Sequence, residues 1–343
     1  MKKSLLSPIF LLLFLLGLPG FVIAQQDTLT VPLLTEQPSF YNYNFVYKNR
    51  LDSIQKIIPL PYNEFVQKYI DIYSSRKDMF GKMLGLSGYY FPIFEKALKS
   101  YNIPEEIKYL PIIESAMDPF AVSRTGATGL WQFMFTTAKG YRLTIDEFID
   151  ERRDPLMASN AAAAYFRDAY ADLDDWLLCL AAYNCGKGAV TRAIAKAGSR
   201  DFWVIRPFLP LETRNYVPAF IAAVYMMNCA KAHQVQEQQC PIILKTDVLL
   251  VNHHVSLPLL AKALNVEERM LCGLNPGYKK KIVNGSAASP KRLVIPKASL
   301  ANFALVYEVL NPGGNTNPLQ DPGKKYISYK SGVNQPQSVT GKM

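Results

Sequence analysis

The stretch PIIESAMDP, residues 111–119, places one carboxylate in the middle of an otherwise apolar run. Counting back from Glu114 by helical intervals, Pro111, Leu110 and Ile107 lie three, four and seven residues before it, so they would share its face of a helix. The other faces carry isoleucine, tyrosine and alanine, and such a helix is apolar on nearly all sides. We therefore expect a helix that is buried in a core, with Glu114 projecting from it.

The ends of this helix can be read from the residues on either side. Pro104 suits a first helical position, Glu105 and Glu106 suit the positive end of the helix dipole, and Asp118 with Pro119 ends the helix. The predicted helix covers 104–117. A carboxylate in such surroundings is poorly solvated, which raises its pKa and keeps it protonated as a general acid near neutral pH. Two alternatives remain for Glu114. It could be a structural glutamate that is buried and held in a salt bridge, or the helix could have a different phase from the one counted here.

Several further segments between residues 60 and 235 have helical spacing, and none has the alternation of a strand. Asp154 and Pro155, for example, are a capping residue and a first-turn proline. The predicted helices cover 62–100, 130–141, 155–170, 175–183, 188–197 and 212–232. The fold class that follows is mainly α, with one all-helical domain in this region.

The pattern changes near Cys240. PIILKTDVLLV, residues 241–251, is rich in leucine and β-branched residues and predicts a strand. Two short helices follow over 256–264 and 266–271, and RLVIP at 292–296 predicts a closing strand. This order is a small β-α-α-β module.

The first 24 residues have the features of a secretory signal: basic Lys2 and Lys3, an apolar run that includes LLLFLLGL, and a small residue, Ala24, at the end. The alternative is a membrane anchor, but the run is short for a span of ~20 residues. No cysteine stands at the expected cleavage site, which argues against a lipid anchor. We expect export to the periplasm or cell envelope. The expected division is 1–24 signal peptide, 25–84 partly helical extension, 85–235 helical domain, 241–300 β-α-α-β module and 301–343 basic flexible tail.

Charge and ligand-forming residues exclude some classes of function. The net charge is +10, and the last 66 residues hold ten Lys and Arg against two acids. Export makes nucleic acid an improbable partner, so an anionic envelope polymer or membrane surface fits better, with a solvated tail as the alternative. Three histidines without HExxH, and five cysteines without CxxC, predict no metal site and no cofactor. The cysteines are expected to be buried thiols with at most one bridge.

Three motifs accompany Glu114 and Ser115. GATGLWQ at 126–132 is a glycine-bearing loop that lets the backbone approach a ligand. AYNCG at 182–186 places an aromatic and an amide at a helix end, and ETRNYV at 212–217 carries another tyrosine. Taken alone, each has an ordinary structural explanation as a turn, a helix stop or core packing.

In this order and spacing the motifs resemble the lytic transglycosylase family, whose catalytic domain is lysozyme-like and of the goose type. The tryptophan of GLWQ and the ETRNYVP stretch are most similar to the membrane-bound transglycosylase D subgroup. The resemblance covers roughly residues 85 to 235. Two features depart from the family pattern: Phe135 stands where a proline is common, and the lipid-anchor cysteine is missing.

The resemblance implies an enzyme that cleaves the MurNAc-β-1,4-GlcNAc bond of peptidoglycan and leaves 1,6-anhydro-MurNAc ends. Glu114 would be the single catalytic acid and base. The residues implied to line the glycan groove are Ser115, Gln132, Tyr183, Asn184 and Tyr216.

Two rival hypotheses remain. A hydrolytic muramidase on the same fold would need a second carboxylate, and Asp118, four residues after Glu114 on the predicted helix, could supply it. We favour a capping and turn role for Asp118 because it precedes Pro119. The second rival is a catalytically silent peptidoglycan-binding protein.

The C-terminal module resembles a LysM module, a small glycan-binding fold. The matching residues are SLPLLAKALNV from Ser256, the turn of Leu274, Asn275 and Pro276, and the closing VIP at 294–296. The usual Gly-Asp-Thr turn is replaced by NHHVS. The resemblance implies that peptidoglycan glycan strands are the partner of this module as well.

Overall fold

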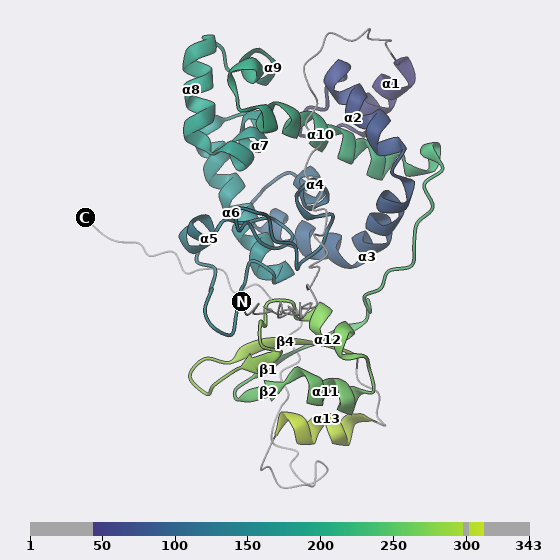
Figure 1. The fold of residues 1–343 in the computed structure, drawn as a ribbon, viewed down its shortest axis with the longest axis vertical. Coiled ribbons are helices and arrows are strands. Elements are labelled where there is room, and N and C mark those ends of the chain that lie inside the picture. Colours follow the sequence, from purple (N-terminus) through teal and green to yellow (C-terminus); the bar gives the residue numbers. More distant parts are fainter. Residues whose placement is uncertain (1–43, 298–301, 312–343) are drawn as a thin grey trace, which may run out of the picture.

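The computed structural model describes residues 44–297 and 302–311. It is mainly helical, with a small α/β module at the C-terminal end, as the sequence predicts (Figure 1). The expected signal segment and most of the expected tail lie outside the described residues. Among the residues that are described, no helix combines the length and the apolar character needed to cross a membrane.

The helical part contains ten α-helices and three short 3-10 helices within the described residues. Their bounds are α1 Phe45–Ile54, α2 Glu64–Ser74, α3 Lys77–Ser100, η1 Glu105–Tyr109, α4 Leu110–Ser115, α5 Phe135–Gly140, α6 Pro155–Leu173, α7 Trp176–Cys185, α8 Lys187–Ala197, α9 Phe202–Ile205, η2 Arg206–Phe208, α10 Leu211–Asn228 and η3 Ala230–His233.

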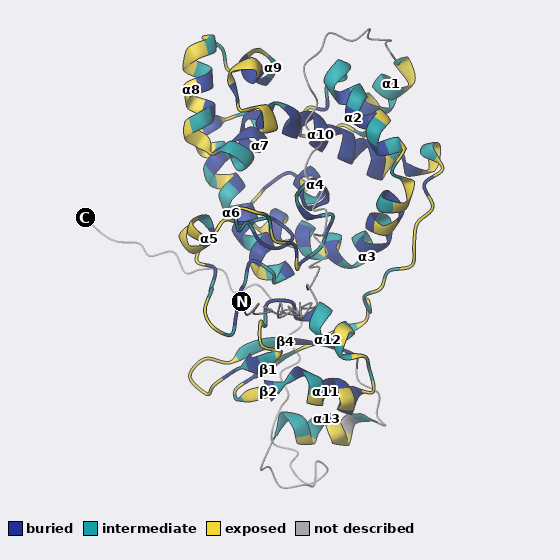
Figure 2. Cartoon of the chain, in the orientation of Figure 1, coloured by how far each residue is buried: buried dark blue, intermediate teal, exposed yellow. Residues whose placement is uncertain are grey.

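The centre of the helical part is α10. Every residue from Asn215 to Met227 is buried, and Figure 2 shows the helix dark blue along most of its length. Helices α2, α4 and α7 pack directly against it. A helix that is apolar on all sides is stable only when other elements enclose it, so the other helices are arranged around α10. The described part of the expected extension, from Asn44 on, shares this core through residues such as Leu51 and Tyr69.

The helix predicted over 104–117 is shorter and divided into η1 and α4. Pro111 has no N–H to donate to the carbonyl of residue 107, so a continuous α-helical ladder cannot pass through it. At the other end, Ala116 and Met117 have φ of 52° and 59°. The Met117 N–H donates to Pro111 O at 3.1 Å, and this bond closes the helix just after Glu114 and Ser115.

The helix predicted over 130–141 is also shorter, because α5 begins only at Phe135. Residues 128–133 instead form a tight turn in which Thr128 pairs with Phe133. Gln132 has φ of 48°, a left-handed conformation that cannot continue an α-helix. The GATGLWQ motif is therefore a loop along its whole length.

The C-terminal module contains two antiparallel strand pairs. The first joins β1 to β4 from Thr246 opposite Pro296 to Val251 opposite Lys291, and the second joins β2 to β3. The predicted order β-α-α-β is thus extended by two short inner strands. The bounds are β1 Thr246–Val251, β2 His254–Ser256, α11 Leu257–Leu264, α12 Glu268–Leu274, β3 Ile282–Asn284, β4 Lys291–Pro296 and α13 Phe303–Leu310.

Helix α13 lies in the segment expected to be a flexible tail from residue 301, so that expectation is wrong for residues 302–311. It packs against α11, and Val306 belongs to the core of the module. The short FALVYEVL run buries an apolar side that the module would otherwise expose.

The connection between the two parts runs along α3 (Figure 1). Gln238 N–H donates to Gly81 O at 3.0 Å, and its side chain donates to Asp78 O. A Cβ at Gly81 or Gly85 would stand 2.3 Å or 2.1 Å from a backbone oxygen of Gln236 or Gln238. The two glycines, one helical turn apart, therefore form the contact that fastens the connection to the helical part.

Replacing Gly85 by alanine should destabilise the protein by roughly 1–3 kcal/mol, because the new methyl group meets backbone rather than a movable side chain. Gly88 on the same helix is the matched control: nothing lies within 4 Å of its Cβ position, so Gly88→Ala should stabilise by about 0.5–1 kcal/mol. Urea unfolding of both variants measures the difference. Equal effects of the two substitutions would contradict the proposed contact.

Candidate active site

Glu114 lies in the last turn of α4 and is partly buried. The hydroxyl of Tyr216, a buried residue of α10, donates to its Oε1. Burial raises the pKa of Glu114 to about 8, and this effect outweighs the hydrogen bond from Tyr216, which lowers it. At neutral pH the carboxyl is therefore mostly protonated, as the sequence predicts for a general acid.

A second carboxylate raises the pKa of Glu114 further. Glu212 on α10 acts through its negative charge, which disfavours ionisation of Glu114. It is exposed and lies one helical turn before Tyr216. Sequence analysis missed this residue, although it stands in the ETRNYV motif; the spacing of four from Tyr216 was the available signal, since such pairs share a helix face.

Tyr183 lies at the end of α7, and its hydroxyl donates to Trp131 O at 2.6 Å. Its ring stacks on Phe166 with 5.1 Å between ring centroids. Burial and the charge of Glu114 both raise the pKa of the Tyr183 phenol. The tyrosine thus lies near enough to Glu114 to be affected by its charge, and it also fixes the loop that carries Gln132.

Ser115 is 2% exposed and faces the protein rather than solvent. Its hydroxyl lies 2.9 Å from Leu130 O and 3.1 Å from Pro111 O. The sequence-based expectation that Ser115 lines an open groove does not match this geometry, because both contacts are backbone carbonyls. The hydroxyl instead joins the end of α4 to the glycine-bearing loop.

Gln132 is partly buried, and its amide nitrogen donates to Gly129 O at 2.8 Å and Ala121 O at 3.3 Å. These bonds hold the side chain across its own loop. Gly129 has φ of 86°, and a Cβ there would stand 1.9 Å from Arg152 O. Only glycine fits this position, where the loop passes directly over the backbone of residue 152.

Asn184 connects α7 to the first turn of α10. Its Oδ1 accepts from Thr213 Oγ1 at 2.7 Å, and its Nδ2 lies 3.4 Å from Glu212 Oε1. The amide therefore contacts the two residues that precede Tyr216 by three and four positions. Among the predicted residues, Tyr216 bonds directly to Glu114, and Tyr183 is affected by the charge of Glu114. Asn184 is connected to them through α10.

Asp118 is not on the helix of Glu114, because the left-handed residues 116 and 117 turn the chain away. Its Oδ1 accepts from Phe120 N–H at 2.8 Å, which is a local turn contact. The assumption that the two carboxylates share a helix face is wrong. The turn role that we favoured from the sequence agrees with this hydrogen bond.

Within residues 44–297 and 302–311, no three His, Cys, Asp or Glu side chains come together as a metal site would require. All five cysteines lie in this part of the chain and are free thiols.

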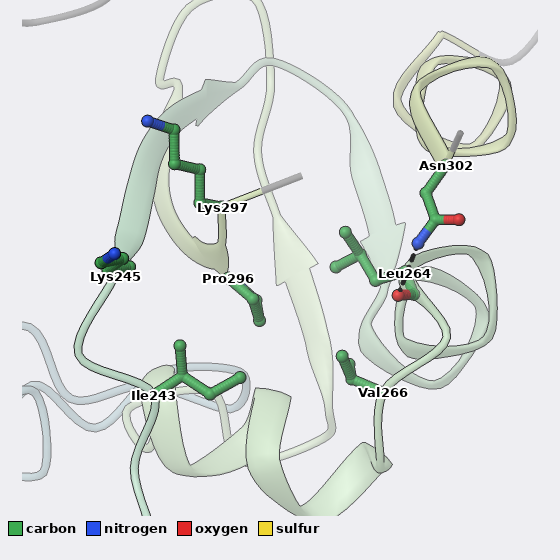
Figure 3. Close-up of a pocket in the computed structure, with 7 residues that line it drawn as sticks. All are labelled: Ile243, Lys245, Leu264, Val266, Pro296, Lys297 and Asn302. Atoms are coloured by element: carbon green, nitrogen blue, oxygen red, sulfur yellow. Dashed lines mark hydrogen bonds between the residues drawn. The ribbon is translucent and has the colours of Figure 1, made fainter. Parts of the chain in front are cut away.

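A hollow of about 340 Å³ lies in the C-terminal module, and none of the candidate residues lines it (Figure 3). Two lysines, Lys245 and Lys297, stand beside an apolar wall, and Asn302 donates to Leu264 O at 3.0 Å. This hollow is separate from Glu114.

Two family profiles match this chain. Residues 91–206 match the transglycosylase SLT domain, and residues 245–311 match the LysM-like domain of lytic transglycosylase MltD. The second match ends at the last residue of the described part of the module, so it includes α13. Glu114, Gln132 and Tyr183 lie in the first match, whereas Tyr216 lies beyond it.

Relatives with assigned names agree with these matches. Membrane-bound lytic murein transglycosylase D of Escherichia coli K12 is 34% identical over 211 residues, which is 58% of this chain and 44% of the relative. Peptidoglycan transglycosylase gp16 of Escherichia phage T7 is 35% identical over 133 residues, 37% of this chain and 10% of the relative. The chain thus spans less than half the length of each of these two relatives.

Among solved structures, the 70 kDa soluble lytic transglycosylase of Escherichia coli is 25% identical, with a TM-score of 0.36. The alignment covers 43% of this chain and 25% of that one.

Two substitutions should move the pKa of Glu114 in opposite directions. Glu212→Gln removes a negative charge and should lower it from about 8, whereas Tyr216→Phe removes the hydrogen bond to the carboxylate and should raise it. A pH titration of ¹³C-labelled glutamate carboxyls by NMR measures both. Glu237→Gln, an exposed glutamate in the connection, is the control and should leave it unchanged. If both substitutions moved the pKa of Glu114 in the same direction, the effects assigned here to Glu212 and Tyr216 would be wrong.

Glu114→Gln should stabilise the protein in a pH-dependent way. The carboxyl ionises at about pH 8 when folded but near 4.5 ordinarily, so ionisation favours unfolding as the pH rises from 4.5 to 8. The variant should gain roughly 3 kcal/mol over the wild type near pH 7, and the gain should vanish below pH 4.5. Denaturant unfolding at pH 4, 7 and 9 measures this; a gain independent of pH would refute it.

Proposed function

We propose that this chain, which carries a transglycosylase SLT domain and an MltD-type LysM-like domain and is homologous to membrane-bound lytic murein transglycosylase D, is a peptidoglycan lytic transglycosylase. It cleaves the MurNAc-β-1,4-GlcNAc bond and leaves a 1,6-anhydro-MurNAc end. The observation that carries the proposal is a single carboxyl, Glu114, protonated at neutral pH and held by a tyrosine.

Glu114 serves as acid and then as base. The protonated carboxyl donates its proton to the glycosidic oxygen, and the bond from that oxygen to the anomeric carbon breaks. The resulting carboxylate then accepts the proton of the C6 hydroxyl of the same MurNAc, whose oxygen bonds to the anomeric carbon. The acid is restored, and no water is consumed.

This route needs only one carboxyl on the enzyme, and the geometry around Glu114 supports it. Two-carboxylate glycosidases hold the second acid roughly 5–9.5 Å from the first. Asp118 is engaged with its own turn, and Glu212 with Asn184. The positive charge that develops at the anomeric carbon would be met by the N-acetyl group of the substrate itself.

The remaining site residues divide into two roles. Gln132, Tyr183 and Asn184 are only partly buried, so they are available to contact the glycan. Tyr216 orients the Glu114 carboxyl and lowers its pKa toward the working range. Ser115 positions the loop against α4.

The setting of the reaction follows from the substrate. Peptidoglycan lies in the cell envelope, and an exported protein with a basic C-terminal segment would meet it there, in wall remodelling or turnover. The LysM-like module would hold the same polymer. Peripheral association with the envelope is part of this proposal.

Mass spectrometry of the muropeptides released from purified peptidoglycan tests the proposal. The wild type should release products that are one water lighter than those of a hydrolase, and Glu114→Gln should reduce release by 10³-fold or more while retaining binding to the polymer. Glu237→Gln is the matched control and should be unaffected. Reducing ends would identify a hydrolase instead, and retained release by Glu114→Gln would refute the site.

A further inference from the structure

The LysM-like module is joined to the helical part by backbone pairing as well as by the connection along α3. Asp150 N–H donates to Gly277 O at 2.8 Å, and Lys279 N–H donates to Phe148 O at 2.8 Å. Residues 148–150 and 277–279 therefore form an isolated antiparallel bridge, with Ile149 opposite Tyr278. A binding module that moved independently of the helical part would not need these backbone hydrogen bonds.

Side chains surround this pairing. Arg292 forms an ion pair with Asp154 at 3.2 Å, and Lys280 forms one with Glu147. The Phe148 ring stacks on His254 with 6.2 Å between ring centroids. The contact thus combines backbone hydrogen bonds, opposite charges and an aromatic stack.

Asp150, whose N–H donates to Gly277 O in this pairing, also forms a buried ion pair. Its two carboxylate oxygens accept from Arg152 Nε at 2.9 Å and Nη2 at 2.8 Å. Asp150 is 4% exposed and Arg152 9%. Two charges are buried together only where geometry and further hydrogen bonds compensate for lost water, so the position of Arg152 depends closely on that of Asp150.

The other side of the guanidinium faces the glycine-bearing loop. Arg152 Nη1 donates to Gly126 O at 3.0 Å and lies 3.3 Å from Phe133 O. One side chain therefore connects the two ends of the loop, and Gly129 packs directly on the backbone oxygen of the same arginine.

The middle of the loop contacts the neighbours of Glu114. Leu130 O accepts from the Ser115 hydroxyl, and Trp131 O accepts from the Tyr183 hydroxyl. The contacts are thus continuous from the module, through Asp150 and Arg152, to the loop and the carboxyl site.

We propose that the LysM-like module braces the active site: its pairing with residues 148–150 holds the Asp150–Arg152 ion pair, and Arg152 holds the Gly126–Phe133 loop in its working position. Asp150 and Arg152 are then positioning residues for the reaction. This inference rests on the proposed function for its kinetic consequence, but its structural part is independent of it.

The test weakens the docking contact in the full chain without touching the loop. The double variant Phe148→Ala/Arg292→Gln removes the aromatic stack and the ion pair with Asp154. The matched control, Phe208→Ala/Arg269→Gln, removes an exposed aromatic and an exposed arginine elsewhere. Amide hydrogen exchange of residues 126–133 is measured first, because it requires no activity.

The docking variant should raise exchange in 126–133 by roughly 3- to 10-fold, and the control should not. Its kcat for release of anhydro-muropeptides should fall about 10-fold with KM within about 2-fold, since a displaced loop impairs the reaction more than binding. Arg152→Lys, which keeps the charge but loses the planar fork, should give the same split between kcat and KM.

Faster exchange confined to 148–150 and 277–279, with 126–133 unchanged, would overturn the brace. Faster exchange in 126–133 with an unchanged kcat would overturn its role in catalysis. If the wild type itself releases no anhydro product, the proposed function fails, and the exchange data still decide whether the module holds the loop.

Discussion

The hydrogen bond from the Tyr216 hydroxyl to the Glu114 carboxyl joins the two helices on which the site depends. Burial of the carboxyl favours its protonated form, and the tyrosine offsets part of that effect, so that the pKa stays at about 8. Both groups are fixed because α10 is enclosed on all sides and α4 packs against it. The local rigidity of the acid is therefore a consequence of the central helix.

The backbone next to the acid adopts unusual conformations. Ala116, Met117 and Gln132 all have positive φ, although none is glycine. Such residues persist where surrounding contacts determine them, and here those contacts are a closed helix end and a loop held by Arg152. The left-handed conformations of Ala116 and Met117 end α4 immediately after Ser115 and turn Asp118 away. Glu114 is therefore the carboxyl that this helix presents at the site.

The helical part and the LysM-like module contact each other next to the residues that hold the glycine-bearing loop. The connection rests on Gly81 and Gly85, and the module pairs with residues 148–150. A binding module tethered by a flexible linker would raise the local concentration of substrate without affecting the reaction. The contacts at the connection and at residues 148–150 instead make the module a structural neighbour of the site. Removing the module would therefore have a different effect from removing a flexibly tethered binding module.

The sequence by itself determined the mainly helical class, the order of most helices, and Glu114 as the carboxyl in an apolar helix, because these follow from local periodicity and spacing. Through the resemblance of their motifs to a family, it also named Tyr183 and Tyr216 as candidates for the glycan groove. Only the tertiary structure decided that Ser115 faces backbone carbonyls, that Asp118 leaves the helix and that α13 completes the module. Only the tertiary structure showed the effect of Glu212 on Glu114 and the contacts of Asp150 and Arg152. Left-handed residues and contacts between distant segments leave no periodic signal, since they are set by packing across the fold.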